Sequence, residues 1–473
     1  MGGCPKKCTY RVADVKMDNI LAIILSAGEG KRMKSDNSKV LHKVCGKSMI
    51  ECVRDAIKIA GISNIVAVVG HKKEQVKEKL KDSVKYAVQE MQQGTGHAVK
   101  MAQEYITNED GYVLVLCGDT PLITSETIKN TIQYHKDNNF AVTIISANEE
   151  NPFGYGRIVR NSNNEVVKIV EQKDATSEEV KIKEVNSGMY CFKTSCLLSA
   201  LKELNSNNSQ GEYYLTDTIE ILINKGEKAG AIVVSDNNEI LGINNRVQLE
   251  KANQIMKKKI NEYHMLNGVT FIDSNSAYIE QDVKIGKDTI IYPNTILEGN
   301  TTIGEGCIIG PNTKIVSSDI RNNVTVNSSQ VLESTINENT KVGPFAYVRP
   351  SSVIGQNVKV GDFVEIKKSE IGDNTKISHL TYVGDAKVGK GVNLGCGVVV
   401  VNYDGKKKYQ TIIGDNSFVG CNVNLISPVE VKSNTFIAAG STITEEVPEN
   451  SLAIARARQE IKEDWVLKRE NKK

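Results

Sequence analysis

The sequence lacks the features of a membrane protein, a nucleic-acid-binding protein and a secreted protein. No apolar run among its 473 residues approaches the roughly 20 residues that span a bilayer. Residues 1–16 contain no apolar core of the kind that a secretory signal requires, and Met17 is an alternative start. Lys and Arg total 59 against 57 Asp and Glu, so a formal charge of +2 gives no general attraction to nucleic acid or anionic membrane. We expect a soluble chain that is too long for one core.

Cysteine pairs of the kind that hold metals or form a disulfide framework are also missing. The ten cysteines are scattered, without a CxxC pair and without a Cys/His set at zinc-finger spacing. We therefore expect small apolar core residues in a reducing cytosol. They stand at positions 4, 8, 45, 52, 117, 191, 196, 307, 396 and 421.

Up to about residue 240, short aliphatic runs alternate with helical stretches. Runs such as "ILAIILSAG" and "GYVLVLCGD" have the character of buried strands, and "MIECVRDAIKIAG" has the spacing of an amphipathic helix. This alternation predicts an α/β domain with a doubly wound parallel sheet of the Rossmann type. Ligands of such sheets bind beyond the carboxyl ends of strands, which is where "SAGEGKR" and "CGDTPL" stand.

The second half of the chain has a six-residue aliphatic period, with a few five-residue steps. Such a period predicts a parallel β-helix, in which each aliphatic fills one corner of a stacked triangular coil. The aliphatic positions are 285, 291, 297, 303, 309 and 315; 336, 342, 348, 354, 360 and 366; 377, 383, 388, 394 and 400; and 413, 419, 425, 431, 437 and 443.

These patterns divide the chain into five segments. Between the two halves, apolar residues recur at helical spacing until Asn267-Gly268, which predicts a linker helix. The predicted segments are a tail at 1–17, an α/β domain at 18–243, a linker helix at 244–267, a β-helix at 268–455 and a basic tail at 456–473.

A glycine-rich turn after the first strand suggests a phosphate site. It is neither a P-loop nor GxGxxG, because Met33 stands where the third glycine would be, and alone it is equally compatible with a structural turn. Lys39, Gln89 and the second turn Gly94-Thr95-Gly96 favour an anionic ligand. Asp119 follows a strand at the position where a metal that holds phosphates is usually anchored.

A polar cluster in the second half suggests another anion site. A single histidine is usually structural, but His379 shares coil-related spacing with several polar and cationic residues. Arg349 and Lys367 are 18 residues apart, and Lys367 and His379 are separated by two hexapeptides. The period lapses at "VNYDGKKKYQT", so Asn402, Tyr403 and the following lysines should project from the coil on the binding face.

An ordered set of motifs carries a resemblance to a known family. "LSAGEGKRM", "SKVLHKVCGKSM", "QGTGHA", "CGDTPL", "GYGRIVR", "VEQKDA", "VNSGMY", "GEYYLTD" and "GINNR" resemble the sugar-1-phosphate nucleotidyltransferases. Together with the hexapeptide half, residues 18 to 470 resemble the bacterial bifunctional N-acetylglucosamine-1-phosphate uridyltransferase / glucosamine-1-phosphate N-acetyltransferase family. The resemblance implies a left-handed β-helix and a chain that makes UDP-N-acetylglucosamine.

For the first site, the resemblance implies uridylyl transfer from UTP to N-acetylglucosamine-1-phosphate with Mg²⁺. Arg32 and Lys39 would be catalytic through the phosphates, and Asp119 and Asn244 would bind the metal. Ser38 departs from the family, which usually has proline before this lysine. The residues implied for UTP and the UDP-sugar are Leu25, Ala27, Gly28, Lys39, Gln89, Gly94, Thr95, Gly156, Glu171, Asn186 and Asn244.

For the second site, the resemblance implies acetyl transfer from acetyl-CoA to glucosamine-1-phosphate, with His379 as general base. Glucosamine-1-phosphate would contact Arg349, Lys367, Tyr382 and Asn393. Acetyl-CoA would contact Cys396, Asn402, Tyr403, Lys408, Cys421, Ala439 and Arg456. Both cysteines depart from the family, which usually has alanine and serine there.

The resemblance also implies a homotrimer and, because UDP-N-acetylglucosamine feeds peptidoglycan, a bacterial cytoplasmic setting. Two alternatives stay open. The first is a single-function sugar-1-phosphate nucleotidyltransferase with a structural or regulatory β-helix, against which His379 and Arg456 argue. The second is a non-catalytic regulatory subunit built from the same modules, against which Arg32, Lys39 and Asp119 argue.

Overall fold

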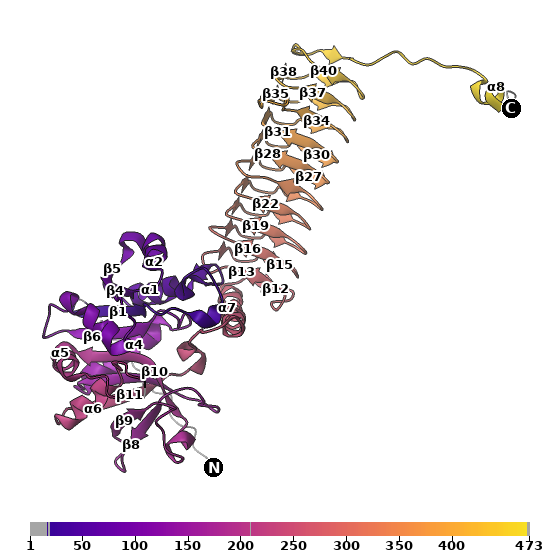
Figure 1. Cartoon of the computed structure of the whole chain (residues 1–473). Coiled ribbons are helices and arrows are strands. Elements are labelled where there is room, and N and C mark those ends of the chain that lie inside the picture. The colour runs from indigo at the N-terminus through magenta and orange to yellow at the C-terminus, as the bar shows by residue number, and fades with distance from the viewer. Residues whose placement is uncertain (1–16, 18, 209, 471–473) are drawn as a thin grey trace, which may run out of the picture. The chain divides into compact units, whose positions relative to one another are not determined.

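The computed structural model describes residues 17, 19–208 and 210–470. The chain separates into two compact units, one within residues 1–256 and one within residues 257–473 (Figure 1). The change from one unit to the other falls inside helix α7 (Arg246–Leu266). The predicted tail, apart from Met17, lies outside the described residues. No helix of the described residues is both long and apolar enough to cross a membrane.

The first unit is built on a mixed sheet in the order β11-β7-β10-β6-β1-β4-β5. Strands β6, β1, β4 and β5 are parallel to one another, and β8 and β9 form a hairpin that joins β10. A small second sheet pairs β2 (Lys43–Val44) with β3 (Lys47–Ser48). The strands of the main sheet are β1 (Ile20–Ser26), β4 (Asn64–Val69), β5 (Lys85–Val88), β6 (Tyr112–Cys117), β7 (Val142–Asn148), β8 (Arg157–Arg160), β9 (Val166–Val170), β10 (Glu184–Lys193) and β11 (Ala229–Val233).

Helices cover both faces of this sheet, because side chains of successive strand residues point to opposite faces. In β1, Leu21 and Ile23 pack in a core with residues of α3, α5 and α6, whereas Ala22 and Ile24 pack in a core with residues of α1, α2 and α4. The helices are α1 (Met49–Ile59), α2 (Lys73–Leu80), α3 (Thr95–Met101), α4 (Ser125–Asp137), α5 (Thr194–Glu203) and α6 (Asp217–Asn224). The predicted doubly wound α/β fold is confirmed.

Two strands of the main sheet depart from the expected all-parallel order. β10 runs antiparallel to both β6 and β7, with a register shift between Asn186 and Tyr190, and β9 runs antiparallel to β8 in the hairpin. Mixed sheets are common, so the alternation of strands and helices does not fix the direction of each strand. The consequence for the site is that β10 brings Asn186 toward the carboxyl end of β6.

The second unit is a parallel β-helix with three faces of short strands. The first face contains β12 (Thr270–Phe271), β15 (Ile290–Ile291), β18 (Ile308–Ile309), β21 (Thr325–Val326), β24 (Lys341–Val342), β27 (Lys359–Asp362), β30 (Lys376–His379), β33 (Asn393–Leu394), β36 (Phe418–Val419), β39 (Phe436–Ile437) and β41 (Leu452–Ala453). The second face contains β13 (Tyr278–Ile279), β16 (Ile296–Glu298), β19 (Lys314–Val316), β22 (Gln330–Leu332), β25 (Tyr347–Val348), β28 (Glu365–Lys367), β31 (Tyr382–Gly384), β34 (Val399–Val401), β37 (Asn424–Ile426) and β40 (Thr442–Ile443).

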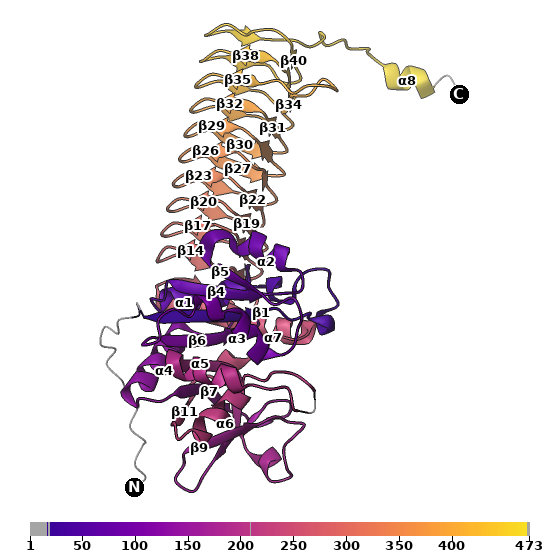
Figure 2. The same ribbon diagram turned by 60° about the vertical axis from the view of Figure 1, so that its left-hand side comes forward.

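The third face is visible as a ladder in Figure 2. It contains β14 (Lys284–Ile285), β17 (Thr302–Ile303), β20 (Asp319–Ile320), β23 (Thr335–Ile336), β26 (Val353–Ile354), β29 (Glu370–Ile371), β32 (Ala386–Val388), β35 (Thr411–Ile413) and β38 (Val429–Val431). After the last coil, a fully exposed segment leads to the short helix α8 (Trp465–Glu470).

The predicted β-helix is confirmed, and its aliphatic period corresponds to an inward-facing ladder. Ile291, Leu297 and Ile309 are fully buried, and each stands on a strand rather than at a turn, so the aliphatics fill the faces and not the corners of the coil. Glycine is required where coils approach closely: a Cβ on Gly286 would lie 2.7 Å from the carbonyl carbon of Gly304 on the next coil.

Candidate active sites

The first candidate site is a cavity of about 300 Å³ beyond the carboxyl ends of β1 and β6. Its walls come from the turn after β1, the 3₁₀ turn at Lys39–Leu41, the turn before α3 and the end of β6. It is lined by Leu25, Ser26, Ala27, Gly28, Lys39, Val40, Gln89, Gln92, Gly94, Thr95, Ala98, Cys117, Asp119 and Glu212. The cavity thus brings together eight predicted residues, Leu25, Ala27, Gly28, Lys39, Gln89, Gly94, Thr95 and Asp119, whereas Arg32 and Asn244 do not line it.

The two glycines that line this cavity, Gly28 and Gly94, have different surroundings. A Cβ on Gly28 would meet no heavy atom within 4 Å, so this backbone faces open space that a ligand can fill. Gly94 has a φ of +102°, and a Cβ there would lie 2.5 Å from the carbonyl oxygen of Tyr213. The same turn is closed by Gln89, which is buried and donates from Nε2 to the Gly94 carbonyl at 3.1 Å.

A chain of polar contacts joins the cations of this site to its oxygen ligands. Lys39 Nζ donates to Asp119 Oδ2 at 2.5 Å and to Asn244 Oδ1 at 2.7 Å. Arg32 Nη2 donates to the same Asn244 oxygen at 2.9 Å. The Lys39 ammonium is thus held between two oxygens at the mouth of the cavity, and both oxygens are ligand types that a hard divalent cation accepts.

The residues predicted for the sugar form a second, adjoining group. Asn186 is buried, donates from Nδ2 to the Tyr190 hydroxyl at 2.8 Å and accepts from the Gly188 N–H at 3.0 Å. A Cβ on Gly156 would lie 3.3 Å from Glu171 Oε1. Burial, followed by the charges of two neighbouring aspartates, raises the pKa of Glu171. Gly188 adjoins the first cavity, because its carbonyl oxygen is 3.5 Å from the thiol of Cys117, which lines that cavity.

The second candidate site is a cationic cluster on the second face of the β-helix. It lies where the strands β28 and β31 end. Lys367 stacks one coil below Gly384, and its Nζ is 3.5 Å from Asp385 Oδ2. Asn402 donates to the same carboxylate oxygen at 2.6 Å. A hydrogen bond with the neighbouring Lys367 ammonium, together with its charge, lowers the pKa of Lys408. Adjacent ammonium groups indicate a surface that favours an anion.

Arg349 extends this cluster by one coil. Arg349 donates its backbone N–H to Ile366, which places it in register with Lys367. Its guanidinium donates to Glu365 Oε1 at 2.8 Å. This hydrogen bond is the largest of the causes that raise the pKa of Arg349. The predicted 18-residue interval thus stacks the two cations. Tyr382 begins the next coil, where its hydroxyl lies against Gly384.

His379 stands at the adjoining edge of the first face, at the end of β30, and is paired with a carboxylate. Its Nδ1 is 2.5 Å from Asp362 Oδ1, and the two residues are opposite one another on β27 and β30. A hydrogen bond from His379 is the largest cause of a lowered pKa at Asp362. Side chains of both residues are accessible, at 55% and 39%. Lys367 and His379, two hexapeptides apart, lie on different faces rather than in one stack.

The residues predicted for acetyl-CoA are exposed, apart from Asn402, which is buried. Tyr403 and Lys408 pair across the loop that interrupts the period. Cys396, Cys421 and Ala439 occupy corner turns of three coils, and the Arg456 side chain approaches the last of these turns. Asn393 lies on the first face between Lys376 and Phe418. Cys396, Cys421 and Ala439 follow His379 along the edge after the first face, whereas Asn402, Tyr403 and Lys408 come after β34 of the second face, at the next edge.

Comparison with protein families gives one match in the first half of the chain and two in the second half. Residues 21–254 match the nucleotidyl transferase family, and residues 282–317 match the bacterial transferase hexapeptide (six repeats) family. Residues 331–467 match the GMPPB C-terminal domain.

Proteins that are similar to this chain match it across both halves. The bifunctional protein GlmU of Acetivibrio thermocellus is 66% identical over 453 residues, which is 96% of this chain and 98% of that protein. The bifunctional protein GlmU of Clostridium kluyveri is 57% identical over 96% of this chain and 99% of its own length. That of Clostridium botulinum strain Loch Maree is 58% identical over 95% of this chain and 98% of its own length.

The chain belongs to the bifunctional GlmU family. It is an enzyme with a nucleotidyltransferase half and a hexapeptide acyltransferase half. The predicted function is confirmed: acetyl transfer to glucosamine-1-phosphate and uridylyl transfer to N-acetylglucosamine-1-phosphate. The predicted cell-wall role follows from the same membership. The alternatives of a single-function transferase and of a non-catalytic subunit are therefore set aside.

Several polar residues of the two sites were not foreseen. Gln92 and Glu212 line the first cavity, and Glu365, Asp385 and Asp362 pair with the cations and the imidazole of the second. For the second site a signal was available, since Asp362 precedes His379 by 17 residues and Asp385 follows Lys367 by 18. Glu212 follows Gly96 of the second glycine turn by 116 residues, and no spacing rule connects them.

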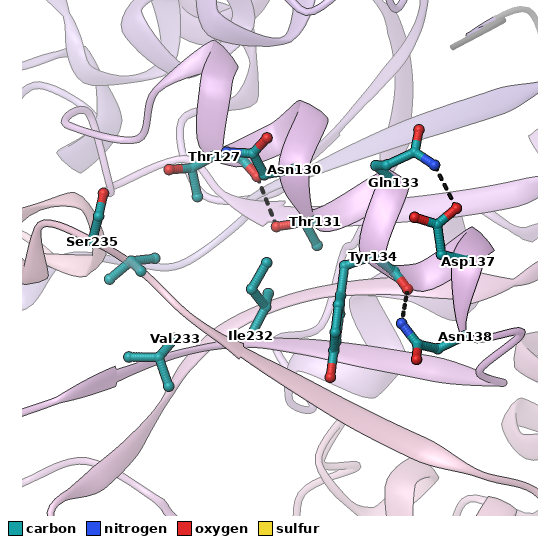
Figure 3. Close-up of a pocket in the computed structure, with 11 residues that line it drawn as sticks. Thr127, Asn130, Thr131, Gln133, Tyr134, Asp137, Asn138, Ile232, Val233 and Ser235 are labelled. Atoms are coloured by element: carbon teal, nitrogen blue, oxygen red, sulfur yellow. Dashed lines mark hydrogen bonds between the residues drawn. The ribbon is translucent and has the colours of Figure 1, made fainter. Parts of the chain in front are cut away.

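Another hollow of the first unit, of about 470 Å³, lies between α4 and the end of β11 (Figure 3). Tyr134, Ile232 and Val233 form its apolar part, and Gln133 turns away to donate to Asp137. Its lining contains none of the residues that the sequence or the family resemblance singled out. Charged groups that could hold a phosphate do not converge on it from the described part of the chain, so it is a poor candidate for either substrate.

Proposed function

We propose that the first cavity binds UTP and that the adjoining Gly156–Glu171–Asn186 group binds N-acetylglucosamine-1-phosphate. The observation that carries this proposal is the position of Lys39, whose ammonium contacts both Asp119 and Asn244 beside the glycine turn. Backbone at Ala27 and Gly28 and the amide of Gln89 would meet the base and ribose, while Arg32 and Lys39 would hold phosphate oxygens.

Mg²⁺ fits the donor set of this site. Asp119 and Asn244 offer a carboxylate oxygen and an amide oxygen to one cation, the Lys39 ammonium, at 2.5 and 2.7 Å. Mg²⁺ is usually bound by one or two carboxylates together with substrate phosphates and water, so two protein oxygens suffice. When bound, the ion would neutralise charge on the phosphates during transfer.

The residues of the chain then act by placement and by charge. The attacking group is already an anionic phosphate, so the reaction needs no general base. Glu171 and Asn186 would hold the sugar so that its phosphate oxygen faces the α-phosphate of UTP in line with the departing pyrophosphate. Arg32 and Lys39 would stabilise the negative charge that accumulates on the transferred group.

We propose that His379 is the general base of acetyl transfer. An ionised Asp362 can only accept, so the 2.5 Å contact assigns the proton of the neutral imidazole to Nδ1 and leaves Nε2 free to take one. The amine of glucosamine-1-phosphate would lose its proton to Nε2 as its nitrogen attacks the thioester carbonyl, and the coenzyme A thiolate would leave. Arg349, Lys367 and Lys408 would hold the sugar phosphate.

Acetyl-CoA would approach along the edge that carries Cys396, Cys421 and Ala439, with Arg456 at its far end, and Asn402 and Tyr403 would contact it from the loop after β34. Asn393 and Tyr382 would contact the sugar. These assignments are supported by the exposure of the edge and by its continuity with His379 over successive coils. No partner other than these small molecules and further copies of the chain is proposed.

We further propose a cytoplasmic homotrimer. The first and second faces expose aromatic and aliphatic side chains, including Phe436 at 49% and Val399 at 36%, and Phe418 stacks on Phe436 at 4.5 Å. Burial of these apolar side chains against copies of the chain would remove them from water. Light scattering of the purified chain measures the mass directly, and a monomer would contradict this proposal.

A paired assay tests the two site assignments. Purified chain receives glucosamine-1-phosphate, acetyl-CoA, UTP and Mg²⁺, and free thiol and pyrophosphate are followed separately. We expect Asp119→Ala to lose pyrophosphate release alone and His379→Ala to lose thiol release alone when N-acetylglucosamine-1-phosphate is supplied for the second reaction. Equal loss of both products in either variant would contradict two separate sites.

A further inference from the structure

Two cysteines occupy the same corner of the β-helix on successive coils. The strands that precede them are in register, with Leu394 opposite Val419. Beyond these strands, the backbone N–H of Asn422 donates to the carbonyl oxygen of Cys396 at 2.8 Å, which keeps Cys396 opposite Cys421. A Cβ on Gly395 would lie 3.0 Å from the Cα of Cys421, which confirms how closely the two turns stack.

The spacing of the coils suits a bond between the two sulfur atoms. Neighbouring strands are about 4.7–4.9 Å apart, and the Cα atoms of a disulfide are usually about 4.4–6.8 Å apart. Both thiols are free and exposed, whereas Cys45, Cys52, Cys191 and Cys307 are buried. Cys396 and Cys421 are the exposed cysteines of the described part of the chain, so a reagent in solution reaches them first.

The pair lies on the edge that we assign to acetyl-CoA. Along the first face, Ile377 of the His379 strand β30 pairs with Leu394 of β33, the strand that leads to Cys396. On the other side, the Gly440 N–H donates to the Cys421 carbonyl, which places Ala439 on the next coil. The order along this edge is therefore His379, Cys396, Cys421 and Ala439, one coil apart from one to the next.

We propose that Cys396 and Cys421 form a dithiol modification site that reacts with low-molecular-weight disulfides. One thiolate attacks the disulfide and expels a thiol, which leaves a mixed disulfide on the protein. The second thiolate then attacks the protein-bound sulfur, forms the Cys396–Cys421 bond and expels the second thiol. The two cysteines lose two electrons and two protons, and the small disulfide is reduced to two thiols.

The consequence for activity rests on the proposed function of this edge. A bond between the two side chains would draw them together across the path of acetyl-CoA, and the mixed disulfide that precedes it would add bulk there. We therefore expect acetyl transfer to fall at least tenfold after oxidation and to recover with dithiothreitol. Uridylyl transfer, which belongs to the other unit, should remain unchanged and serves as the internal control.

The test uses the full chain and oxidised glutathione as the probe. After incubation at neutral pH, free thiols are blocked with N-ethylmaleimide and the protein is digested with trypsin without reduction. Cleavage at lysine separates Cys396, in residues 391–406, from Cys421, in residues 409–432. We expect these two peptides to appear as one cross-linked species, two hydrogens lighter than their sum, and the denatured chain to remain monomeric on a non-reducing gel.

Matched variants make each outcome decisive. Cys396→Ser and Cys421→Ser should each prevent the cross-link, and each should keep after oxidation the rate of acetyl transfer that the same variant shows before it, whereas Cys196→Ser, at a half-buried thiol of the first unit, should still form the cross-link and lose acetyl transfer tenfold. Prior saturation with acetyl-CoA should slow the cross-link. Absence of the cross-linked peptides, or a link between chains, overturns the proposal.

Two further results separate this proposal from the proposed function. A cross-link that leaves acetyl transfer unchanged overturns the consequence for activity that is drawn here. A reduced chain that transfers no acetyl group contradicts the function proposed for the edge, while the peptide masses still decide whether the dithiol site exists.

Discussion

The two sites of this chain are assembled in different ways. In the first unit, Lys39 meets Asp119 and Asn244 across 80 and 205 residues of sequence, in a cavity where backbone turns and buried side chains fix each position. In the β-helix, Asp362 meets His379 across 17 residues, on an open edge where one coil simply lies on the next. The first site depends on a tertiary fold and the second on a repeat.

This difference has an electrostatic counterpart. Burial is the largest cause that raises the pKa of Glu171, a half-buried carboxyl group of the first site, and of Asp217, whose charge acts on Glu171. In the second site, the accessible side chain of Asp362 is paired with His379, and their hydrogen bond lowers the pKa of Asp362. We therefore expect substitutions in the first unit to alter both stability and activity, and those on the β-helix edge to alter activity with little effect on stability.

The largest expected effect is the loss of uridylyl transfer in Asp119→Ala. This change removes one of two oxygens that hold the Lys39 ammonium and that are proposed to hold Mg²⁺, so pyrophosphate release should fall by about 10³-fold. Acetyl transfer should be unchanged because its site lies in the other unit. The control is Asp110→Ala, at an exposed position before β6, the strand that Asp119 follows. Equal losses of pyrophosphate release in both variants would contradict the assignment.

His379→Ala should cost acetyl transfer about 10²-fold or more, because the proposed general base is lost. Uridylyl transfer from supplied N-acetylglucosamine-1-phosphate should persist. Lys376→Ala, an exposed residue of the same strand β30, provides a matched control that should retain acetyl transfer. If both variants lose activity to the same extent, the β-helix edge itself has been perturbed and His379 has no special role.

Sequence reasoning reached further in the β-helix than in the α/β unit. A six-residue period fixes which residues stack, so the pairing of Arg349 with Lys367 followed from arithmetic. The same arithmetic contains the Asp362–His379 pair, which was overlooked. No period connects Lys39 with Asn244, and this contact was available only through resemblance to a family. The direction of β10 was not predictable either, because the residue composition of a buried strand does not show which way the strand runs.

Asp362→Asn tests how the second site is tuned. The carboxylate orients the His379 imidazole and keeps the proton of the neutral ring on Nδ1, so the amide should slow acetyl transfer about tenfold, a moderate effect for partly exposed groups. The variant keeps Lys359, whose positive charge also lowers the pKa of Asp362 in the unaltered chain.

The control for this change is Asp319→Asn, which removes an exposed ion pair with Arg321 on the third face. It should leave the rate of acetyl transfer unchanged. Equal slowing in the two variants would mean that Asp362 supports the coil and not the imidazole.

The smallest expected effect belongs to Asp217, a half-buried carboxyl group in the first turn of α6. Burial, together with Glu220 and Asp174, raises the pKa of Asp217 to about 6. Because its pKa in the folded state exceeds that in the unfolded chain, the folded state binds this proton more tightly. The stabilising contribution is therefore complete below about pH 4 and is lost as the pH rises through about 6.

Asp217→Asn removes the charge that is unfavourable at high pH. Relative to the unaltered chain, the variant should gain about 1 kcal/mol more unfolding free energy at pH 8 than at pH 5, after allowance for partial solvent screening. Calorimetry at the two pH values measures the difference, and comparison within one position removes any constant effect of Asn at the start of α6. A difference that does not change with pH would mean that Asp217 is as well solvated as the carboxylates of the β-helix edge, and the electrostatic contrast between the two units would then not extend to this residue.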